Sequence, residues 1–355
     1  MQQVRIEEFI ALARQYPVVD VRSPAEYCHA HIPGAYSLPL FSDEERKVVG
    51  TIYKQQGREQ AIKAGLDYFG VKMRKMVEEA EKITADHKSA NSRPATPNCL
   101  LLHCWRGGMR SAGVSWLLDL YGFKVYTLEG GYKAFRNWVL RQLEQPFPFR
   151  VLGGYTGSGK TGVLKTMADA KHAIIDLEGI AHHKGSAFGA LGETKQPGQE
   201  MFENILGTEL HTIAGTLPPG EPIWIEDESR RIGSVNLPDA MWKTIQESPL
   251  YFLAVPFEAR LDHISKEYGK FKKEELVSAV MRIQKRLGGL NTKNVVNYLL
   301  EDNCKESFRI LLSYYDKYYE RSLHERATTS APIKMIACAS VDGGVNFKKL
   351  TGEKY

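Results

Sequence analysis

The sequence has little of what membrane, secreted and zinc-binding proteins depend on. Its 355 residues contain no apolar run near the roughly eighteen residues that span a membrane, and the first letters, MQQVRIEEF, lack the apolar stretch of a signal peptide. The five cysteines have neither paired CxxC nor histidine spacing, which argues against a disulfide framework and a zinc site. We therefore expect a cytoplasmic protein without membrane contact, in which each cysteine is a candidate for reactivity.

Net charge is also low, but it is unevenly distributed. The formal charge of the whole chain is +5, yet nine Lys and Arg residues stand against four Asp and Glu residues between Arg260 and Lys293 alone. Such clustering favours contact with a polyanion such as RNA. A solvated helix face would have the same composition, so the pattern leaves both interpretations open.

The first part of the chain has the pattern of an α/β domain. YPVVDVRS and CLLLHC predict buried strands, SAGVSWLLDLYGF predicts a helix that ends at Gly122, and KVYTLEGG predicts another strand. This order indicates a parallel sheet, whose sites lie beyond the carboxyl ends of the strands, where Cys104 would be. Residues 41–97 interrupt the pattern, and we interpret their charged and polar letters as an insertion with a flexible tail.

A second α/β domain begins after EQPFPFR, where two prolines interrupt the pattern. We place the first domain at residues 1–145 and the second at residues 146–355, since a chain of this length favours two cores. Strands are predicted at RVLGG, HAIIDLEG, PIWIEDES and LYFLAVP, and a short one at IKMIACAS. The part between about 257 and 326 is predicted to be mostly helical.

The loop that begins at Cys104 has the composition of a nest for an anion. Three sources of positive charge would point toward one bound anion. They are the backbone amides, the positive end of a helix that begins near Gly108, and the planar cation of Arg110. The same groups lower a thiol pKa, so Cys104 is predicted to be partly thiolate and nucleophilic, unless it is a buried structural cysteine. Cysteine phosphatases and enzymes that carry sulfur or selenium both need such a loop. Its anion-binding residues would be Arg106, Gly107, Gly108 and Met109.

A second phosphate-binding loop is predicted by GYTGSGKT, which matches GxxxxGK[ST] between a predicted strand and a predicted helix. In this motif amides surround a di- or triphosphate, the lysine adds a point charge and the threonine reaches a magnesium ion. The loop residues expected to bind a diphosphate are Gly154, Gly157, Ser158, Gly159, Lys160 and Thr161.

Charged residues follow two strands of this second domain. Asp176, Glu226 and Asp227 are predicted to lie near the P-loop, and Arg230 and Arg231 are predicted to bind the far phosphates. The alternative is that ESRR forms a surface ion-pair patch. The neighbouring His-His pair has no matching ligands, so the identity of any metal stays open.

Two blocks around the cysteine loop resemble rhodanese domains. The loop itself, from Cys104 to Arg110, is one residue longer than in common sulfurtransferases and is similar in length to that of rhodanese-like phosphatases. A longer loop accommodates a tetrahedral, phosphate-sized group, which indicates a phosphorylated donor. The matching residues are Asp20, Arg22, Glu26, His31, Ile32, Pro33, Gly34 and Ala35 in the first block, and Leu128, Gly130, Gly131 and Trp138 in the last.

Nearly the whole chain resembles the tRNA 2-selenouridine synthase family, through HCWRGGMRS, GGYTGSGKT and IEDESRRIG in that order. The resemblance implies a transferase that attaches a geranyl group from geranyl diphosphate to the sulfur of a wobble 2-thiouridine, and then replaces the S-geranyl group with selenium from selenophosphate. Cys104 and Arg110 would be catalytic, with selenium carried on Cys104 as phosphate departs, while the P-loop would hold the diphosphate.

The same resemblance implies the partners of the chain. These are the anticodon arm of tRNA and an enzyme that supplies selenophosphate, with no tightly bound cofactor and with Mg²⁺ as an optional ion. Tyrosines near the basic segment would stack on a base, unless they belong to the core. The expected tRNA contacts are Lys270, Lys272, Lys273, Arg282, Lys285 and Arg286.

Two alternative functions fit parts of the pattern. One is a rhodanese-like cysteine phosphatase fused to a nucleotide-dependent kinase domain. The other is a regulatory rhodanese module on a GTPase, against which stand the presence of Cys104 and the absence of an NKxD motif.

Overall fold

The computed structural model describes residues 1–90, 98–328 and 331–352. Contacts divide the chain into two units, the first with residues 1–142 and 203–208 and the second with residues 143–202 and 209–355. Each unit contains a parallel sheet with helices, which confirms the predicted α/β fold class. Among the described residues, no helix has both the length and the apolar character needed to cross a bilayer.

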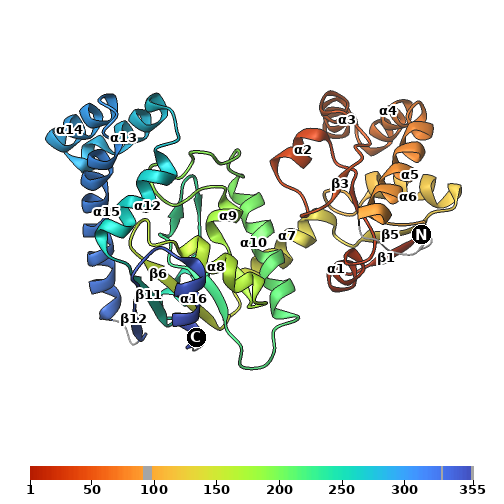
Figure 1. Cartoon of the computed structure of the whole chain (residues 1–355). Helices are drawn as coiled ribbons and strands as arrows, with labels where there is room; N and C mark the ends of the chain where they lie inside the picture. The colour runs from red at the N-terminus through yellow and green to blue at the C-terminus, as the bar shows by residue number, and fades with distance from the viewer. Residues whose placement is uncertain (91–97, 329–330, 353–355) are drawn as a thin grey trace. The chain divides into compact units, whose positions relative to one another are not determined.

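The sheet of unit 1 has the order β1-β5-β4-β2-β3, and all of its pairings are parallel (Figure 1). Its strands are β1 (Gln2–Val4), β2 (Val18–Asp20), β3 (Tyr36–Ser37), β4 (Cys99–His103) and β5 (Lys124–Leu128). Its helices are α1 (Ile6–Ala13), α2 (Pro24–His29), α3 (Asp43–Gln56), α4 (Arg58–Gly70), α5 (Met73–Ala90), α6 (Met109–Tyr121) and α7 (Gly131–Leu143).

The apolar letters of β4 are explained by its central place in this sheet. Leu100, Leu101 and Leu102 are fully buried, as expected for a parallel strand that is covered on both faces. The register pairs Asp20 of β2 with His103 of β4. The carboxyl ends of the two strands therefore meet where Cys104 follows.

The predicted insertion contributes to the core of unit 1. Helix α5 carries buried side chains at Met76, Val77, Ala80 and Ile83, a spacing that places them on one face of a helix. These side chains belong to the same apolar cluster as Leu100 and Leu102 of β4. The charged letters of the segment obscure this stripe in the sequence. The predicted flexible tail, KSANSRPATPN, begins at Lys88, which the structure places in α5, and its residues 91–97 lie outside the described residues.

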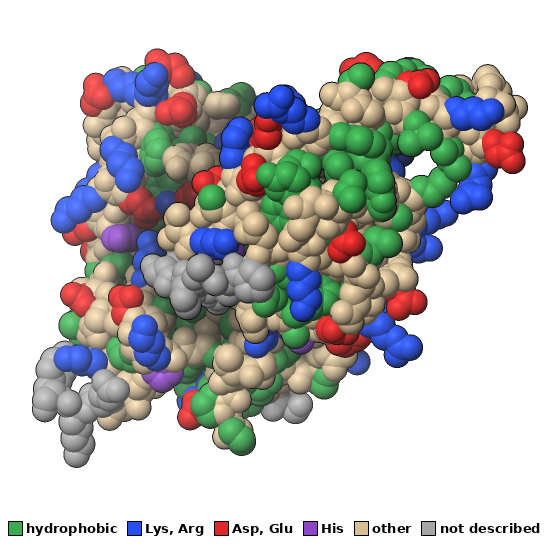
Figure 2. All heavy atoms as spheres, turned by 90° about the vertical axis from the view of Figure 1, so that its right-hand side faces the viewer, with side chains coloured by type: hydrophobic (Ala, Val, Ile, Leu, Met, Phe, Trp, Pro, Cys, Tyr) green, Lys and Arg blue, Asp and Glu red, His purple; other side chains and the backbone are tan. Residues whose placement is uncertain are grey.

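The outer side of this helical layer is mixed in character. Figure 2 faces the side of unit 1 and shows apolar side chains gathered among charged ones. On α6, Trp116, Leu120 and Tyr121 are exposed. Helix α6 therefore packs on the sheet with one face and presents aromatic groups on the other.

The sheet of unit 2 has the order β12-β11-β6-β8-β7 and is also parallel. Its strands are β6 (Phe149–Gly154), β7 (Ile174–Ile175), β8 (Ile223–Glu226), β11 (Leu250–Ala254) and β12 (Ile333–Ala337), and β9 (Arg231–Ile232) and β10 (Val235–Asn236) form a separate hairpin. Its helices are α8 (Lys160–Asp169), α9 (Leu177–Ala181), α10 (Gln199–Ala214), α11 (Asp239–Gln246), α12 (Phe257–Tyr268), α13 (Lys273–Leu287), α14 (Gly289–Leu300), α15 (Cys304–Ala327) and α16 (Gly343–Thr351).

The position of β6 in the middle of this sheet places the P-loop. Its register pairs Leu152 with Glu226 of β8 and Gly154 with Leu253 of β11. The loop after β6 and the acidic residues after β8 consequently lie at the same edge. Helices α12 to α15 share an apolar cluster of their own, and α13 and α14 pack beside α15 (Figure 1).

Candidate functional site

The cysteine loop lies between the end of β4 and the start of α6. Cys104 follows His103, and Gly108 is the N-cap of α6, as the sequence predicts. Gly107 has a φ of 64°, and a Cβ atom at this position would lie 2.6 Å from the carbonyl oxygen of Leu128. Only glycine fits there, because a side chain would collide with the turn after β5.

The turn after β5 closes against the same loop. The amide of Tyr132 donates to the carbonyl oxygen of Cys104 at 2.8 Å, and the amide of Lys133 donates to that of Trp105 at 3.0 Å. A Cβ atom at Gly131 would lie 2.4 Å from the oxygen of Cys104. The closing block that resembles rhodanese therefore braces the loop by direct backbone contact.

The thiol of Cys104 is held by hydrogen-bond donors. The amide of Gly108 donates to its Sγ at 3.3 Å, and Ser111 Oγ lies at the same distance of 3.3 Å. Burial by itself would raise the thiol pKa, but the Ser111 hydroxyl, these amides and the charge of Arg110 outweigh it, so the pKa of Cys104 is lowered. The direction agrees with the predicted thiolate, and Ser111, which directly follows Arg110 in the sequence, supplies the hydroxyl.

The other buried cysteines differ from Cys104. Burial raises the pKa of Cys99 to about 11 and also raises the pKa of Cys338. These two thiols stay protonated and unreactive at neutral pH. All five cysteines are free, with Cys28 exposed.

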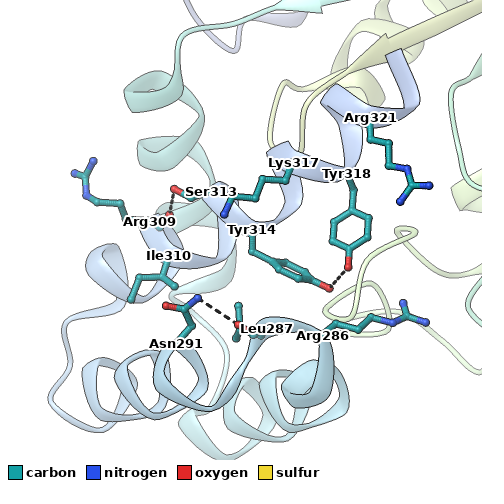
Figure 3. Close-up of a pocket in the computed structure, with 10 residues that line it drawn as sticks. All are labelled: Arg286, Leu287, Asn291, Arg309, Ile310, Ser313, Tyr314, Lys317, Tyr318 and Arg321. Carbon is teal, nitrogen blue, oxygen red and sulfur yellow. Dashed lines mark hydrogen bonds between the residues drawn. The ribbon is translucent and has the colours of Figure 1, made fainter. Parts of the chain in front are cut away.

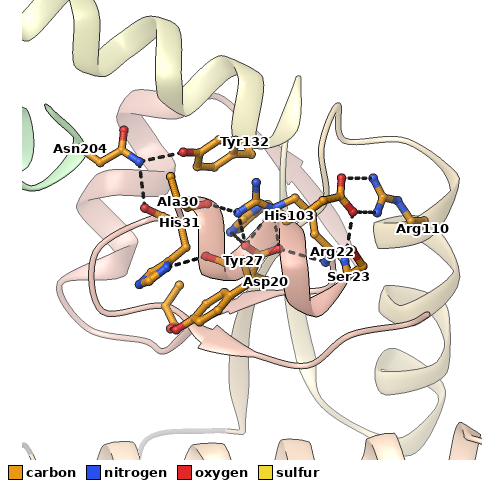
Figure 4. Close-up of polar contacts among 12 residues, drawn as sticks. Asp20, Arg22, Ser23, Tyr27, Ala30, His31, His103, Arg110, Tyr132 and Asn204 are labelled. Carbon is orange, nitrogen blue, oxygen red and sulfur yellow. Dashed lines mark hydrogen bonds and ion pairs between the residues drawn. The ribbon is translucent and has the colours of Figure 1, made fainter. Parts of the chain in front are cut away.

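The two arginines of the loop lie in different surroundings. Arg110 donates to both carboxylate oxygens of Glu26, at 2.7 and 3.3 Å (Figure 4), while Arg106 is exposed. Burial would raise the pKa of Glu26, but the hydrogen bonds and charge of Arg110 lower it. The planar cation of Arg110 is thus oriented by an acid from the first rhodanese-like block.

A buried charged cluster lies beneath the loop. Arg22 Nη2 donates to Asp20 Oδ2 at 2.6 Å and to the carbonyl oxygen of Ala30 at 2.7 Å (Figure 4), and its guanidinium lies 3.9 Å from the ring centre of Tyr132. Burial lowers the pKa of His103, which is therefore neutral. These contacts fix the end of β2 and the chain before α2, which carries Glu26.

The P-loop of unit 2 connects β6 to α8 with glycines in left-handed conformations. Gly157 has a φ of 78° and Gly159, the N-cap of α8, a φ of 79°. Lys160 is held inward by its contact with the carbonyl oxygen of Gly154 at 3.4 Å. The loop borders a cavity of about 860 Å³. Gly157, Ser158, Gly159, Lys160 and Thr161 line this cavity, and Gly154 lies behind them at the end of β6.

Lys160 keeps its positive charge in this cavity. Burial disfavours the charged form, but Tyr319 and the neighbouring glutamates outweigh burial and raise the pKa of Lys160 above its ordinary range. A permanent cation therefore stands at the end of the loop, as the binding of a diphosphate requires.

Two further glutamates, each close after the end of a strand, face the P-loop cavity. Glu178 lies 3.4 Å from the hydroxyl of Thr161, and Glu228 lines the same cavity. Burial, followed by the charge of Glu178, raises the pKa of Glu228 to about 8. Burial thus favours the protonated form of Glu228. Its place in IEDES and that of Glu178 in DLEG, both just after strands, are the sequence signals for this role.

The predicted acidic residues occupy three different positions. Asp176 lines the cavity and caps α9 through the amide of Gly179. Asp227 also lines it and pairs with Arg326 at 3.2 Å. Glu226 is completely buried and accepts the amide hydrogen of Glu178 at 3.0 Å, so it supports the site from behind.

The two arginines predicted to bind far phosphates separate. Arg230 lines the cavity and pairs with Asp239. Arg231 lies in the β9 hairpin, where its Nε donates to the carbonyl oxygen of Gly233 at 2.9 Å, and it is not among the residues that line the cavity. Arg230 lies in the bend before β9 and Arg231 is the first residue of β9, so these two neighbours in the sequence enter different surroundings.

The basic segment does not form one surface. Arg260 is buried in an ion pair with Asp316, Lys273 pairs with Asp302, and Arg282 donates to the carbonyl oxygen of Ala187. Lys270 and Lys272 are exposed before α13. Lys285 and Arg286 line two different cavities.

The tyrosines near this segment divide in the same way. Tyr268 is buried in the cluster of helices α12 to α15. Burial raises the pKa of Tyr319 to about 12, and its ring faces Lys160 in the P-loop cavity. Tyr318, by contrast, is exposed.

Comparison with known proteins identifies relatives of nearly the whole chain. A family model described as the tRNA 2-selenouridine synthase AAA domain matches residues 147–334, and one described as a rhodanese-like domain matches residues 6–137. A protein named tRNA 2-selenouridine synthase from Sulfurovum sp. (strain NBC37-1) is 35% identical over 347 residues, which cover 88% of this chain and 90% of the relative. Proteins of the same name from Marinobacter nauticus and Cupriavidus pinatubonensis are 33% and 38% identical; the matches cover 87% and 71% of this chain and 89% and 66% of the relatives.

Proposed function

The chain belongs to the tRNA 2-selenouridine synthase family, and from this premise we propose that it converts a wobble 2-thiouridine to 2-selenouridine in two steps. In the first step the P-loop unit uses geranyl diphosphate to make an S-geranyl intermediate. In the second step the rhodanese-like unit uses selenophosphate, and selenium replaces the S-geranyl group. The anticodon arm of tRNA is the macromolecular substrate.

For the first step, the sulfur of the uridine forms a bond to C1 of the geranyl group while the C–O bond to diphosphate breaks. Negative charge grows on the departing diphosphate, and the permanent cation of Lys160 with the P-loop amides stabilises it. No three His, Cys, Asp or Glu side chains of the described residues are grouped to hold a metal ion. A Mg²⁺ ion that accompanies the diphosphate would be held by Thr161 and Glu178 and would neutralise part of the diphosphate charge.

For the second step, oxidation states decide how Cys104 takes part. Selenium in selenophosphate is at the selenide level, so leaving it on Cys104 as a perselenide, with phosphate departing, would need a two-electron oxidant. Attack of the thiolate on phosphorus needs none: the S–P bond forms, the P–Se bond breaks, and its electron pair leaves with selenium as hydroselenide. Water then hydrolyses the phosphocysteine. Attack at phosphorus suits a cysteine loop that has the length found in phosphatases. In this scheme Cys104 carries a phosphoryl group, in place of the selenium that the resemblance implies.

Hydroselenide then attacks C2 of the S-geranylated uridine, and geranyl thiolate leaves as the C2–S bond breaks. Hydroselenide and geranyl thiolate are both soft nucleophiles, and both form without a change of oxidation state. The observation that carries the proposal is the lowered pKa of Cys104 inside a cradle of amides, in a chain whose family makes 2-selenouridine.

Reconstitution tests the proposal. The purified chain is incubated with an anticodon stem-loop RNA that contains 2-thiouridine, geranyl diphosphate and selenophosphate, and the nucleosides are identified by mass spectrometry. We expect selenouridine from the wild type, accumulation of the S-geranyl nucleoside with Cys104→Ser, and unmodified 2-thiouridine with Lys160→Ala. Selenouridine from Cys104→Ser at the wild-type rate would refute the role of the thiolate.

The same preparation distinguishes the phosphatase and kinase alternative. A cysteine phosphatase would release phosphate from a generic aryl phosphate, and a kinase domain would bind and hydrolyse ATP through Lys160. Strong ATP hydrolysis without any geranylation would reject the proposed role of the P-loop.

A further inference from the structure

A second cavity, of about 740 Å³, lies where the end of α13 and the start of α14 meet α15 (Figure 3). Its lining contains four cations and no acidic residue. A surface that gathers cations without anions has a strong positive potential and attracts a polyanion. The cations are Arg286, Arg309, Lys317 and Arg321.

The spacing on α15 creates this surface. Arg309, Lys317 and Arg321 recur at intervals of four or eight residues, so they lie along one face of the helix. Tyr314 and Tyr318, also four apart, form the neighbouring row; their ring centres are 5.1 Å apart and their hydroxyl oxygens 3.4 Å apart. The helix therefore presents a row of cations next to a row of aromatic rings.

Two of these cations have no acidic partner in the described part of the chain. The other two do have partners among the described residues: Arg309 pairs with Glu258 and Glu306, and Arg321 pairs with exposed Glu325 on its own helix. The Arg321 pair is exposed and therefore weak. Arg286 and Lys317 take part in none of the ion pairs formed by the described residues. Their charge is thus available to a ligand.

The cavity adjoins the P-loop cavity. Arg286, Tyr314 and Tyr318 line both of them, and Tyr318 is 50% exposed. An extended ligand that lies against α15 would consequently reach the cavity in which Lys160 stands.

We propose that this cavity binds single-stranded RNA, with Tyr318 stacked on a base and Arg286 and Lys317 on phosphates. Rows of cations interleaved with aromatic rings are the usual construction of sites for single-stranded nucleic acid, since every base has a face that stacks and every nucleotide a phosphate. The site delivers a nucleotide of the anticodon loop to the P-loop cavity. This inference rests on the proposed function, because it takes the tRNA substrate as given.

Binding of a fluorescent anticodon stem-loop RNA, measured by anisotropy across salt concentrations, tests the site. We expect Arg286→Ala with Lys317→Ala to weaken binding about tenfold or more and to reduce the slope of log affinity against log salt by about 1.4, since each neutralised phosphate of a single strand contributes about 0.7. The matched control, Lys266→Ala with Lys293→Ala, removes the same charge from α12 and α14 outside the cavity and is expected to stay within about twofold. Thermal melts establish that all variants are folded.

Tyr318 provides the second readout. Tyr318→Ala is expected to weaken binding about tenfold, whereas Tyr318→Phe keeps the ring and is expected to bind like the wild type. Equal binding by the alanine and phenylalanine variants would overturn the stacking role.

The two proposals fail in different ways. Unchanged affinity and salt slope in the Arg286/Lys317 variant, with a wild type that binds and selenates the RNA, would overturn the RNA site and leave the proposed function intact. A wild type that neither binds nor modifies the RNA would overturn both.

Discussion

Both terminal nitrogens of Arg110 donate to the carboxylate of Glu26, although the two residues are 84 positions apart in sequence. Arg110 belongs to the cysteine loop, and Glu26 to α2 in the first rhodanese-like block. The pair holds a planar cation at the start of α6, where its charge contributes to the lowered pKa of Cys104. Charge and orientation of this arginine are therefore separable by mutation.

Replacement of Arg110 separates the two contributions. Arg110→Ala removes the charge and should raise the pKa of Cys104, whereas Arg110→Lys keeps the charge but loses the paired contact with Glu26. We expect the lysine variant to retain a reactive thiol and to raise KM for selenophosphate about tenfold, a loss of about 1.4 kcal/mol. Alkylation rates against pH, together with steady-state kinetics, measure both effects; an equal KM in the lysine variant and the wild type would contradict the role of orientation.

The reactivity of Cys104 should depend on pH through Ser111. Because the folded pKa of Cys104 lies below the ordinary thiol value of 9.0, its alkylation by iodoacetamide should reach half of its maximum below pH 9, and Ser111→Ala should shift the midpoint upward. A depressed acid pKa adds stability above the unfolded pKa, and this stability is lost as pH falls through the folded value. Peptide mass mapping follows each cysteine separately, and Cys99, whose pKa is raised to about 11, serves as the unreactive internal control.

Binding of diphosphate should weaken as Glu228 loses its proton. The pKa of Glu228 is raised to about 8, so between the ordinary value of 4.5 and about 8 the folded state holds a proton that the unfolded state has lost, and stability falls as pH rises across this interval. Above about pH 8 a new negative charge faces the P-loop cavity.

We expect the affinity of the wild type for inorganic diphosphate to fall about tenfold between pH 7 and pH 9, and that of Glu228→Gln to fall much less, because glutamine cannot ionise. Calorimetric titration at each pH measures this difference. The matched control is Glu247→Gln, an exposed residue after α11, which should follow the wild type. Parallel pH profiles for wild type and Glu228→Gln would show that another group titrates.

Replacement by alanine should have very different effects on stability at two glycines with positive φ. Gly131 has a φ of 59°, and its Cβ atom would lie 2.4 Å from the oxygen of Cys104, whereas Gly122 has a φ of 109° with no atom within 4 Å of its Cβ. Gly131→Ala should destabilise unit 1 by about 3 kcal/mol and slow alkylation of Cys104, while Gly122→Ala should cost about 1 kcal/mol and leave the thiol unaffected. Urea unfolding and alkylation provide the two readouts, and similar behaviour of both variants would mean that the turn after β5 does not shape the cysteine loop.

Most strands and both phosphate-binding loops were predictable because their signals are local. A continuous apolar run such as CLLLHC is typical of a central strand in a parallel sheet that is covered on both faces. A glycine-rich loop of this pattern between a strand and a helix is typical of phosphate binding. The contribution of residues 41–97 to the core could not be predicted, because the apolar stripe of α5 is spread among charged letters and is visible only when its partners on β4 and α6 are known.

By itself, the sequence determined the fold class, the position of Cys104 just after β4 and of Lys160 at the start of α8, and the family to which the chain belongs. Tertiary structure alone decided which charges are available to a ligand. Arg260 lies 56 positions from Asp316 in the sequence, and Arg110 lies 84 positions from Glu26, yet folding pairs them. Arg286 and Lys317 converge on one cavity from different helices. The physical reason is that electrostatic energy depends on distances in space and on burial, neither of which is a property of neighbouring letters.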